Sequence, residues 1–446
     1  MRKSEENAKE FVLSTAAEHD VKFIRLWFTD ILGFLKTFAI TVEELEDALN
    51  DGEVFDGSSI EGFARYDEHD MIAKPDPSTF QILPWRPKES AVGRMFCDVL
   101  EPDGTPYVGD PRLVLKTSLK RASALGFSFY VQPEMEYYYV KNADLPLQPL
   151  DTGGYFDMTP LDGATDLRRD TVMALEQMGI GVEFSHHEAG PSQNEISLRY
   201  TDALTMADYM MTYRLVVKEI AIRHQVYATF MPKPYANHNG SGMHVHVSLF
   251  RGSTNAFYDK DEPYNLSPVA RCFIAGLMRH APETMLVTNQ WVNSYKRIVP
   301  GFEAPLYVSW ALRNRADMIR VPAFPPGKHE AMRIEYRAPD PACNPYLAFA
   351  VILAAGLEGI EKNYELGVPA DRNVLEMSGE ERRQAGIREL PRDLNEALKL
   401  AEQSELLRNV LGDYLFDKLL ENKRQEWERY RMQVTNYELE TFLPLL

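Results

Sequence analysis

Charged and imidazole side chains spaced two residues apart mark four short segments of this chain, and this spacing constrains the fold more than any other feature. Residues i and i+2 of a β-strand lie on one face, so each segment predicts a strand with a polar and an apolar face. Acids that neighbour one another on a sheet repel unless a cation lies between them. The spacing therefore predicts polar strand faces that line one concave, cation-dependent surface. The segments are 133–137 (PEMEY), 243–248 (MHVHVS), 333–337 (RIEYR) and 186–195, where a Gly-Pro hairpin turn separates two acidic ends.

Each of these segments also has a purely structural explanation when taken singly. Paired glutamates commonly mark a solvated sheet edge, paired histidines can be structural, and an Arg-Glu-Arg row is commonly a surface ladder of ion pairs. All four segments occur in one part of the chain with apolar residues opposite, which favours a shared site. Glutamates with one or two histidines suit Mg²⁺ or Mn²⁺, and neighbouring arginines suit phosphate. The combination predicts phosphoryl transfer, and without Walker or kinase motifs the nucleotide site must be of another type.

Helical and strand-like periodicities alternate along the chain and predict an α+β fold. Residues 1–105 predict a small domain with a helix at 6–19 and strands at 22–28 and 35–40, and residues 106–446 predict a larger domain. Four prolines between positions 75 and 87 predict an extended, non-helical crossing. In the larger domain we expect helices at 111–125, 166–179, 203–225, 266–287 and 345–362, strands at 127–140, 182–200, 226–233, 242–250 and 332–338, and mostly helix in the last hundred residues.

The composition excludes several classes of protein. With 66 Asp+Glu against 48 Lys+Arg, the formal net charge of −18 argues against a general nucleic-acid binder. A hydrophobic content of 45% excludes a disordered chain. Three distant cysteines disfavour a disulfide framework or a cysteine zinc site. No apolar stretch reaches the ~20 residues that span a bilayer, and the charged N-terminus lacks a signal-peptide pattern. We therefore expect a soluble, cytoplasmic protein without nucleic-acid or membrane partners.

Three loops carry further candidate residues. The glycines of 237–242 (NHNGSG) allow a backbone to approach a ligand closely, although a plain turn has the same composition. Residues 293–297 (NSYKR) run into 300–305 (PGFEAP), a loop bounded by Gly and Pro that carries one acid and is either a mobile lid or an exposed turn. The Asp-Gly pair in 55–59 (FDGSS) is typical of a hairpin turn.

Together, the motifs resemble type I glutamine synthetases in family order and over nearly the whole chain. The resemblance implies a β-grasp N-terminal domain and a catalytic domain with a curved antiparallel sheet flanked by helices. It also implies a homododecamer of two stacked hexameric rings, with active sites between neighbouring subunits. The motifs are 55–63 (FDGSSIEGF), 133–139 (PEMEYYY), 186–196 (HHEAGPSQNEI), 231–248 (MPKPYANHNGSGMHVHVS), 293–305 (NSYKRIVPGFEAP), 314–322 (NRADMIRVP) and 333–350 (RIEYRAPDPACNPYLAFA).

The resemblance also implies a role for each site residue. One divalent ion would be held by Glu136, Glu188 and Glu195, and a second by Glu134, His244 and Glu335. Glutamate would be bound by Gly240, Arg297, Glu303 and Arg337. The nucleotide and its phosphates would be bound by His246, Ser248, Arg315, Arg320 and Arg333. Ammonium would be bound by Asp56 from the neighbouring subunit, which also takes its proton, with Ser59, Tyr155, Glu188 and Glu303.

The implied reaction is the ATP-dependent ligation of ammonia to the γ-carboxylate of L-glutamate through γ-glutamyl phosphate. Its products are L-glutamine, ADP and phosphate, and its cofactors are two or three Mg²⁺ or Mn²⁺ ions per site. Several stretches also resemble an actinobacterial-type paralogue group that includes γ-glutamylpolyamine synthetases, although Asp56, Ser59 and Tyr155 favour ammonia. A catalytically silent regulatory homologue is a third interpretation, and a nitrogen-regulatory protein is a possible additional partner. The chain departs from the family pattern at Ser192, where a glycine is common, so a different hairpin tip is expected.

Overall fold

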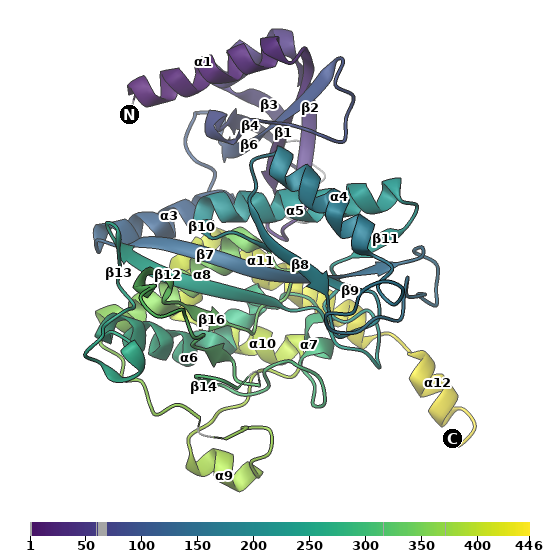
Figure 1. Cartoon of the computed structure of the whole chain (residues 1–446), viewed down its shortest axis with the longest axis vertical. Helices are drawn as coiled ribbons and strands as arrows, with labels where there is room; N and C mark the ends of the chain where they lie inside the picture. Colours follow the sequence, from purple (N-terminus) through teal and green to yellow (C-terminus); the bar gives the residue numbers. More distant parts are fainter. Residues whose placement is uncertain (1, 59, 61–68, 315, 371) are drawn as a thin grey trace.

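The computed structural model of the chain describes residues 2–58, 60, 69–314, 316–370 and 372–446, and two β-sheets organise them (Figure 1). The first sheet has the strand order β2-β1-β6-β4-β3, with β5 paired to β6. Its central pair, β1 and β6, is parallel, and the other pairs are antiparallel. The predicted N-terminal helix and first two strands are confirmed. The elements are α1 (Arg2–Glu18), β1 (Val21–Thr29), β2 (Leu35–Thr41), α2 (Leu45–Asp51), β3 (Glu53–Asp56), β4 (Asp70–Pro75), β5 (Gln81–Ile82) and β6 (Ala91–Leu100).

The proline-rich crossing between positions 75 and 87 is not extended throughout, which corrects the prediction from sequence. A single 3₁₀ turn forms at Pro77–Thr79 because the Asp76 carboxylate accepts a hydrogen bond from the Ser78 amide. A proline at the first position of such a turn loses no backbone bond. The short strand β5 follows this turn.

The second sheet is long and carries the four polar segments. Its strand order is β14-β15-β16-β12-β7-β9-β8, with β10 and β11 paired to β7 and β13 paired to β12. An antiparallel sheet was expected, and every pair is antiparallel except β14 and β15, which are parallel. Its strands are β7 (Ser128–Val140), β8 (Val182–His187), β9 (Gln193–Leu198), β10 (Thr201–Asp202), β11 (Tyr227–Thr229), β12 (Met243–Arg251), β13 (Thr254–Asn255), β14 (Trp310–Ala311), β15 (Ile319–Arg320) and β16 (Ile334–Tyr336).

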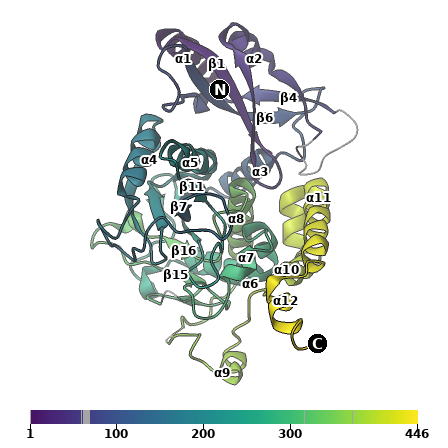
Figure 2. The same ribbon diagram turned by 90° about the vertical axis from the view of Figure 1, so that its right-hand side faces the viewer.

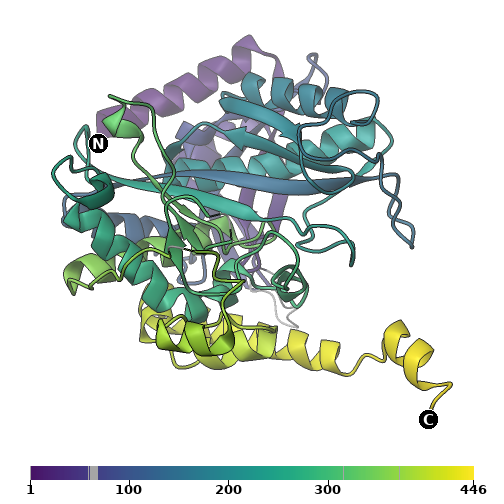
Figure 3. The same ribbon diagram turned by 60° about the horizontal axis from the view of Figure 1, so that its bottom comes forward.

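Helices flank this sheet, and the five predicted between residues 111 and 362 all form within a few residues of their expected bounds. In Figure 2 the first sheet lies above them, and in Figure 3 α12 extends away from the rest of the chain. No helix in the described part of the chain has both the length and the apolar character needed to cross a bilayer. The helices are α3 (Pro111–Ala124), α4 (Thr165–Gln177), α5 (Ala203–Arg223), α6 (Pro268–Thr288), α7 (Ser294–Arg297), α8 (Pro345–Glu361), α9 (Gly379–Gln384), α10 (Leu394–Ala401), α11 (Glu405–Arg431) and α12 (Asn436–Phe442).

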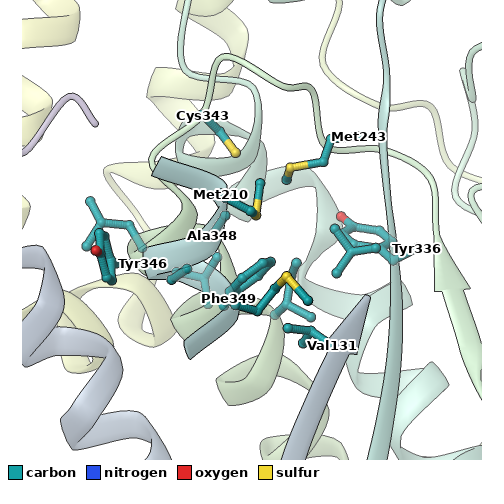
Figure 4. Close-up of a cluster of buried hydrophobic side chains, with 14 of the residues drawn as sticks. Val131, Met210, Met243, Tyr336, Cys343, Tyr346, Ala348 and Phe349 are labelled. Carbon is teal, nitrogen blue, oxygen red and sulfur yellow. The ribbon is translucent and has the colours of Figure 1, made fainter. Parts of the chain in front are cut away.

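The apolar side of the second sheet packs against α5 and α8. Figure 4 shows Val131, Met243 and Tyr336 from three adjacent strands facing Met210 of α5 and Phe349 of α8. Helix α8 is apolar nearly all round and therefore lies inside the core. This burial fixes the strand register, because a slip of one residue would exchange the polar and apolar faces.

Candidate active site

The register of the strands brings the predicted acids and histidines onto one face of the second sheet. His244 of β12 lies opposite Glu134 of β7, and Glu136 of β7 lies opposite Glu195 of β9. On the other side of β12, His246 lies opposite Glu335 of β16. The predicted alternation of polar and apolar faces is therefore confirmed, and residues from four strands form one continuous polar face.

Imidazole and carboxylate groups are in contact at the centre of this face. His246 Nε2 lies 2.9 Å from Glu134 Oε1, and His244 Nδ1 lies 3.4 Å from Glu134 Oε2 and 3.7 Å from Glu335 Oε1. Burial works against the charged form of Glu134, but the bonds from the two histidines outweigh it and lower the pKa of that carboxyl. Burial, with the charge of Arg337, lowers the pKa of His244, which favours the neutral imidazole that ligates metals.

A second group of acids lies beside the first. Single ligand atoms of His186, Glu188 and Glu195 fall within 4.8 Å of one another, as do those of Glu134, His246 and Glu335. Burial, then the charge of Glu188, raises the pKa of Glu136 to about 8. Burial and the neighbouring glutamates raise the pKa of Glu195 well above its ordinary value. Buried carboxylates that oppose one another's ionisation, with imidazoles beside them, make a donor set that fits Mg²⁺ or Mn²⁺.

A small cavity of about 20 Å³ adjoins this acidic group. Arg297 is fully buried at its wall and donates to the carbonyls of Ala338 (2.9 Å) and Arg337 (3.1 Å). Gly242 makes this packing possible, because a Cβ there would lie 2.6 Å from the Arg297 guanidinium. Arginine side chains and carboxylates of the acidic group therefore line the same cavity. Its lining includes Glu136, Glu188, Gln193, Gly240, His244, Arg297, Phe302, Glu303 and Arg337.

A larger cavity of about 590 Å³ lies at the other end of the polar face, lined by Glu134, His246, Ser248 and Arg333. His246 Nδ1 accepts from Arg333 Nε at 3.2 Å, so the Nε2 proton points at Glu134. Four aromatic rings complete the wall and provide flat apolar surface: those of Tyr130, Phe184, Tyr200 and Phe250. Another cavity, of about 880 Å³, lies among helices α6, α8 and α11 and contains none of the predicted site residues.

Arg320, Arg337 and Ser248 are further candidates, and they lie on or directly after strands of the second sheet. Arg320 donates to one oxygen of Glu335 and Arg337 to the other, the latter at 2.5 Å. Burial opposes ionisation of Glu335, but the surrounding histidine and arginine charges lower its pKa to about 2. Ser248 donates to the Met332 carbonyl at 2.9 Å. Sequence reasoning omitted Gln193, whose amide donates to Glu136 Oε2 at 2.8 Å.

Among the described residues, the ammonium-pocket candidates come from separate parts of the fold. Asp56 ends β3 on the first sheet, is exposed, and accepts 2.9 Å bonds from the amide and hydroxyl of Ser58, which hold its pKa below the usual range. Tyr155 is 45% exposed and stacks on Phe156, with its ring edge-on to His186. Ser59 and Arg315 lie outside the described residues. The Asp-Gly pair at 56–57 does not make a two-residue hairpin, because β4 begins only at Asp70.

Ser192 occupies the left-handed region at the tip of the β8–β9 hairpin, with φ of 64°. Its amide donates to Asp151 Oδ1, and its hydroxyl accepts from the Asp151 amide, both at 2.7 Å. His187 bonds to the same Asp151 and, through Nδ1, to the Glu188 carbonyl at 2.7 Å. The serine therefore keeps the glycine-like turn and ties the hairpin that carries Glu188 to the loop that carries Tyr155.

Two substitutions of Ser192 should separate backbone strain from hydrogen bonding. Ser192→Ala keeps the strained φ and leaves the Asp151 amide unpaired, so we expect a loss of about 1–3 kcal/mol in the free energy of unfolding. Ser192→Gly loses the same bonds but relieves the strain, so we expect a change within about 1 kcal/mol. Urea unfolding measures both. An alanine variant as stable as the glycine variant would contradict this account.

Comparison with known proteins identifies the family. The family described as "Glutamine synthetase, catalytic domain" matches residues 108–442, and "Glutamine synthetase, beta-Grasp domain" matches residues 20–102. A protein named glutamine synthetase from Mycolicibacterium smegmatis is 56% identical over 442 residues, covering 98% of this chain and 99% of the relative. Another so named, from Methanosarcina mazei, is 50% identical over 441 residues, covering 98% of each.

A solved structure described as "GmaS/ADP complex-Conformation 1" has a TM-score of 0.88 at 32% identity, covering 97% of this chain and 99% of that one. These matches confirm the predicted β-grasp domain and the α+β architecture around a curved sheet. The two family matches span most of the chain, and the relatives match it nearly end to end. The chain is therefore a ligase that belongs to the type I glutamine synthetase family.

Proposed function

We propose that the protein ligates ammonia to the γ-carboxylate of L-glutamate at the expense of ATP, through γ-glutamyl phosphate. One observation carries the proposal: a single polar sheet face joins the 590 Å³ cavity to the small arginine-lined cavity through buried carboxylates. A nucleotide at one end and a small amino acid at the other would place the transferred phosphoryl group over this face. The similar GmaS structure is an ADP complex, which supports a nucleotide site in this fold.

Two divalent ions, Mg²⁺ or Mn²⁺, fit the acidic groups on the polar face. Glu136, Glu188 and Glu195 would hold one ion, and Glu134, His244 and Glu335 the other. When bound, such ions neutralise charge on transferring phosphoryl oxygens. The raised pKa values of Glu136 and Glu195 support a cation there, because in its absence these buried carboxylates resist ionisation together.

Arginines around the face would orient both substrates. Arg297 and Arg337, with the Gly240 backbone, would bind glutamate and direct its γ-carboxylate toward the nucleotide. Arg315, Arg320 and Arg333 would bind phosphate oxygens, while His246 and Ser248 would contact the nucleotide. Phosphorylation converts the carboxylate, a poor electrophile, into an acyl phosphate with a good leaving group.

Ammonium must lose a proton before it can attack the acyl phosphate. Asp56 of a neighbouring subunit would accept that proton, which it can do because Ser58 keeps its carboxyl ionised. Ser59, Tyr155, Glu188 and Glu303 would complete the ammonium pocket. The 300–305 loop, which carries Glu303, would exclude water from the acyl phosphate.

The same proposal includes the assembly. Asp56 is exposed on the first sheet, while the acidic face lies on the second, which supports a site completed by a neighbouring subunit. We propose a homododecamer of two hexameric rings, with a domain boundary between residues 105 and 106. The two family matches, which end at residue 102 and begin at residue 108, support that boundary.

The choice of amine decides between ammonia and the polyamine alternative. We would incubate the protein with ATP, Mg²⁺ and glutamate, add ammonium or putrescine, and measure phosphate and the amide product. We expect ammonium to stimulate phosphate release with equimolar glutamine. Stimulation by putrescine but not ammonium would favour a γ-glutamylpolyamine synthetase. ATP binding without turnover with any amine would favour a silent homologue.

A further inference from the structure

Lys233 lies where two loops around the small cavity meet, and none of the roles above includes it. Its side chain is buried, with 7% of its surface exposed. The Lys233 Nζ donates to the His238 carbonyl at 2.5 Å and lies 3.2 Å from the centre of the Phe302 ring. Burial lowers the pKa of Lys233 to about 8, so the ammonium is charged at neutral pH.

The backbone of Lys233 is held in place independently of its side chain. Its amide donates to Asn293 Oδ1 at 2.8 Å, and the Asn293 side-chain amide donates back to the Lys233 carbonyl at 3.0 Å. Asn293 immediately precedes α7, which ends at the cavity-lining Arg297. The ammonium therefore projects from a fixed point beside the cavity.

The 300–305 loop is partly exposed, although Ala304 and Pro305 are buried. Gly301 adopts φ of 92° with open space around it, and Glu303 is exposed. Phe302, Glu303 and Ala304 nevertheless line the small cavity with Arg297. A contact that holds the Phe302 ring therefore also holds Glu303 over the cavity.

We propose that Lys233 is a positioning residue that holds the 300–305 loop over the small cavity through the face of Phe302. A desolvated ammonium over an aromatic face is a strong version of this contact. The inference rests on the proposed function, because its consequence concerns the acyl phosphate. With the loop released, water attacks in place of the amine, and γ-glutamyl phosphate and water give glutamate and phosphate. ATP is then consumed without amide formation.

The test measures phosphate released per amide formed. We expect Lys233→Met and Phe302→Leu each to raise this ratio about tenfold, the factor that corresponds to roughly 1.4 kcal/mol. Lys233→Arg and Phe302→Tyr, which keep a cation and a ring, should stay within about twofold of wild type. The double variant Lys233→Met/Phe302→Leu should resemble either single variant, because both remove one contact. Lys218→Met is the matched control, since that lysine lies 5.8 Å from the ring of a different residue, Phe230.

A second measurement does not depend on turnover. Amide hydrogen exchange at residues 301–304, which have backbone amides, should accelerate about tenfold in Lys233→Met but not in Lys218→Met. An unchanged ratio with unchanged exchange would overturn the role of Lys233, even if wild type forms glutamine. Wild-type turnover tests the proposed function, whereas the difference between variant and wild type tests this inference.

Discussion

Replacing Asp56 with alanine is expected to reduce glutamine formation about 10²- to 10⁴-fold, the range that a positioned general base contributes. Mg²⁺ binding should not change, because Asp56 lies on the first sheet and the acidic face lies on the second. Steady-state assays at saturating ammonium measure the first effect, and calorimetric titration with Mg²⁺ measures the second. Loss of Mg²⁺ binding in this variant would contradict the role of general base proposed for Asp56.

Asp103 provides a matched control for this substitution. Its carboxylate accepts bonds from the Thr105 amide (2.9 Å) and hydroxyl (2.6 Å), the same local pattern that Ser58 gives Asp56. Asp103→Ala should therefore reproduce any effect of losing such a turn, without the loss of activity. A loss of activity as large as that of Asp56→Ala would mean that turn geometry, not proton transfer, explains the result.

Mixed assemblies test whether the site is shared between subunits. Asp56→Ala and Glu136→Gln subunits should each be inactive alone. In an equal, random mixture about a quarter of shared sites would pair an intact Asp56 with an intact Glu136, and activity should return to that level. If both residues served the same site from one chain, mixing would restore nothing.

Local periodicity explains which parts of this fold could be predicted from the sequence. The two-residue period of strands predicts that Glu134 and His244 share one face, and the burial of Met135 and Val245 on the other face fixes that arrangement. The parallel pairing of β14 with β15 could not be predicted, because strands of two residues carry no period. The turn at Pro77–Thr79 was missed although Asp76 and Pro77 form a capping pair.

The features of the site that could not be predicted from the sequence depend on contacts between segments that are distant in the chain. Lys233 contacts Phe302 only because two loops converge in the fold, and no pattern in the sequence around either residue indicates this contact. Gln193 was visible beside Glu195, but its bond to Glu136 depends on the pairing of β7 with β9. The turn at Ser192 was expected to differ from the family, yet the serine adopts the conformation that glycine favours.

Replacing Glu136 with glutamine is expected to change stability and metal response in opposite directions. Without metal, burial and the charge of Glu188 raise the pKa of Glu136 from 4.5 to about 8 in the folded protein. Between these values the folded state holds a proton that the unfolded state has lost, so stability falls as pH rises, at up to about 1.4 kcal/mol per pH unit. Glu136→Gln does not ionise and should remove the part of this decline that Glu136 contributes, while Glu195 retains its own. Gly242 and Gln193 both donate to Oε2, which the glutamine oxygen can replace, so the variant should fold.

Thermal unfolding at pH 5 and pH 8, with EDTA or with Mg²⁺, measures both effects. Mg²⁺ at about 100 times its Kd should stabilise wild type by roughly 2.7 kcal/mol, because an ion that binds only the folded state adds that much. Glu136→Gln should be more stable than wild type at pH 8 in EDTA, gain less from Mg²⁺, and form almost no glutamine.

Glu53→Gln is the matched control, because burial and then the charges of Glu44 and Asp47 raise the pKa of Glu53 in the other sheet. It should alter the pH dependence but not the Mg²⁺ response. If Glu136→Gln kept the full Mg²⁺ stabilisation, the ion would not contact Glu136. Mg²⁺ binding would then not explain why this acid is buried on the polar face.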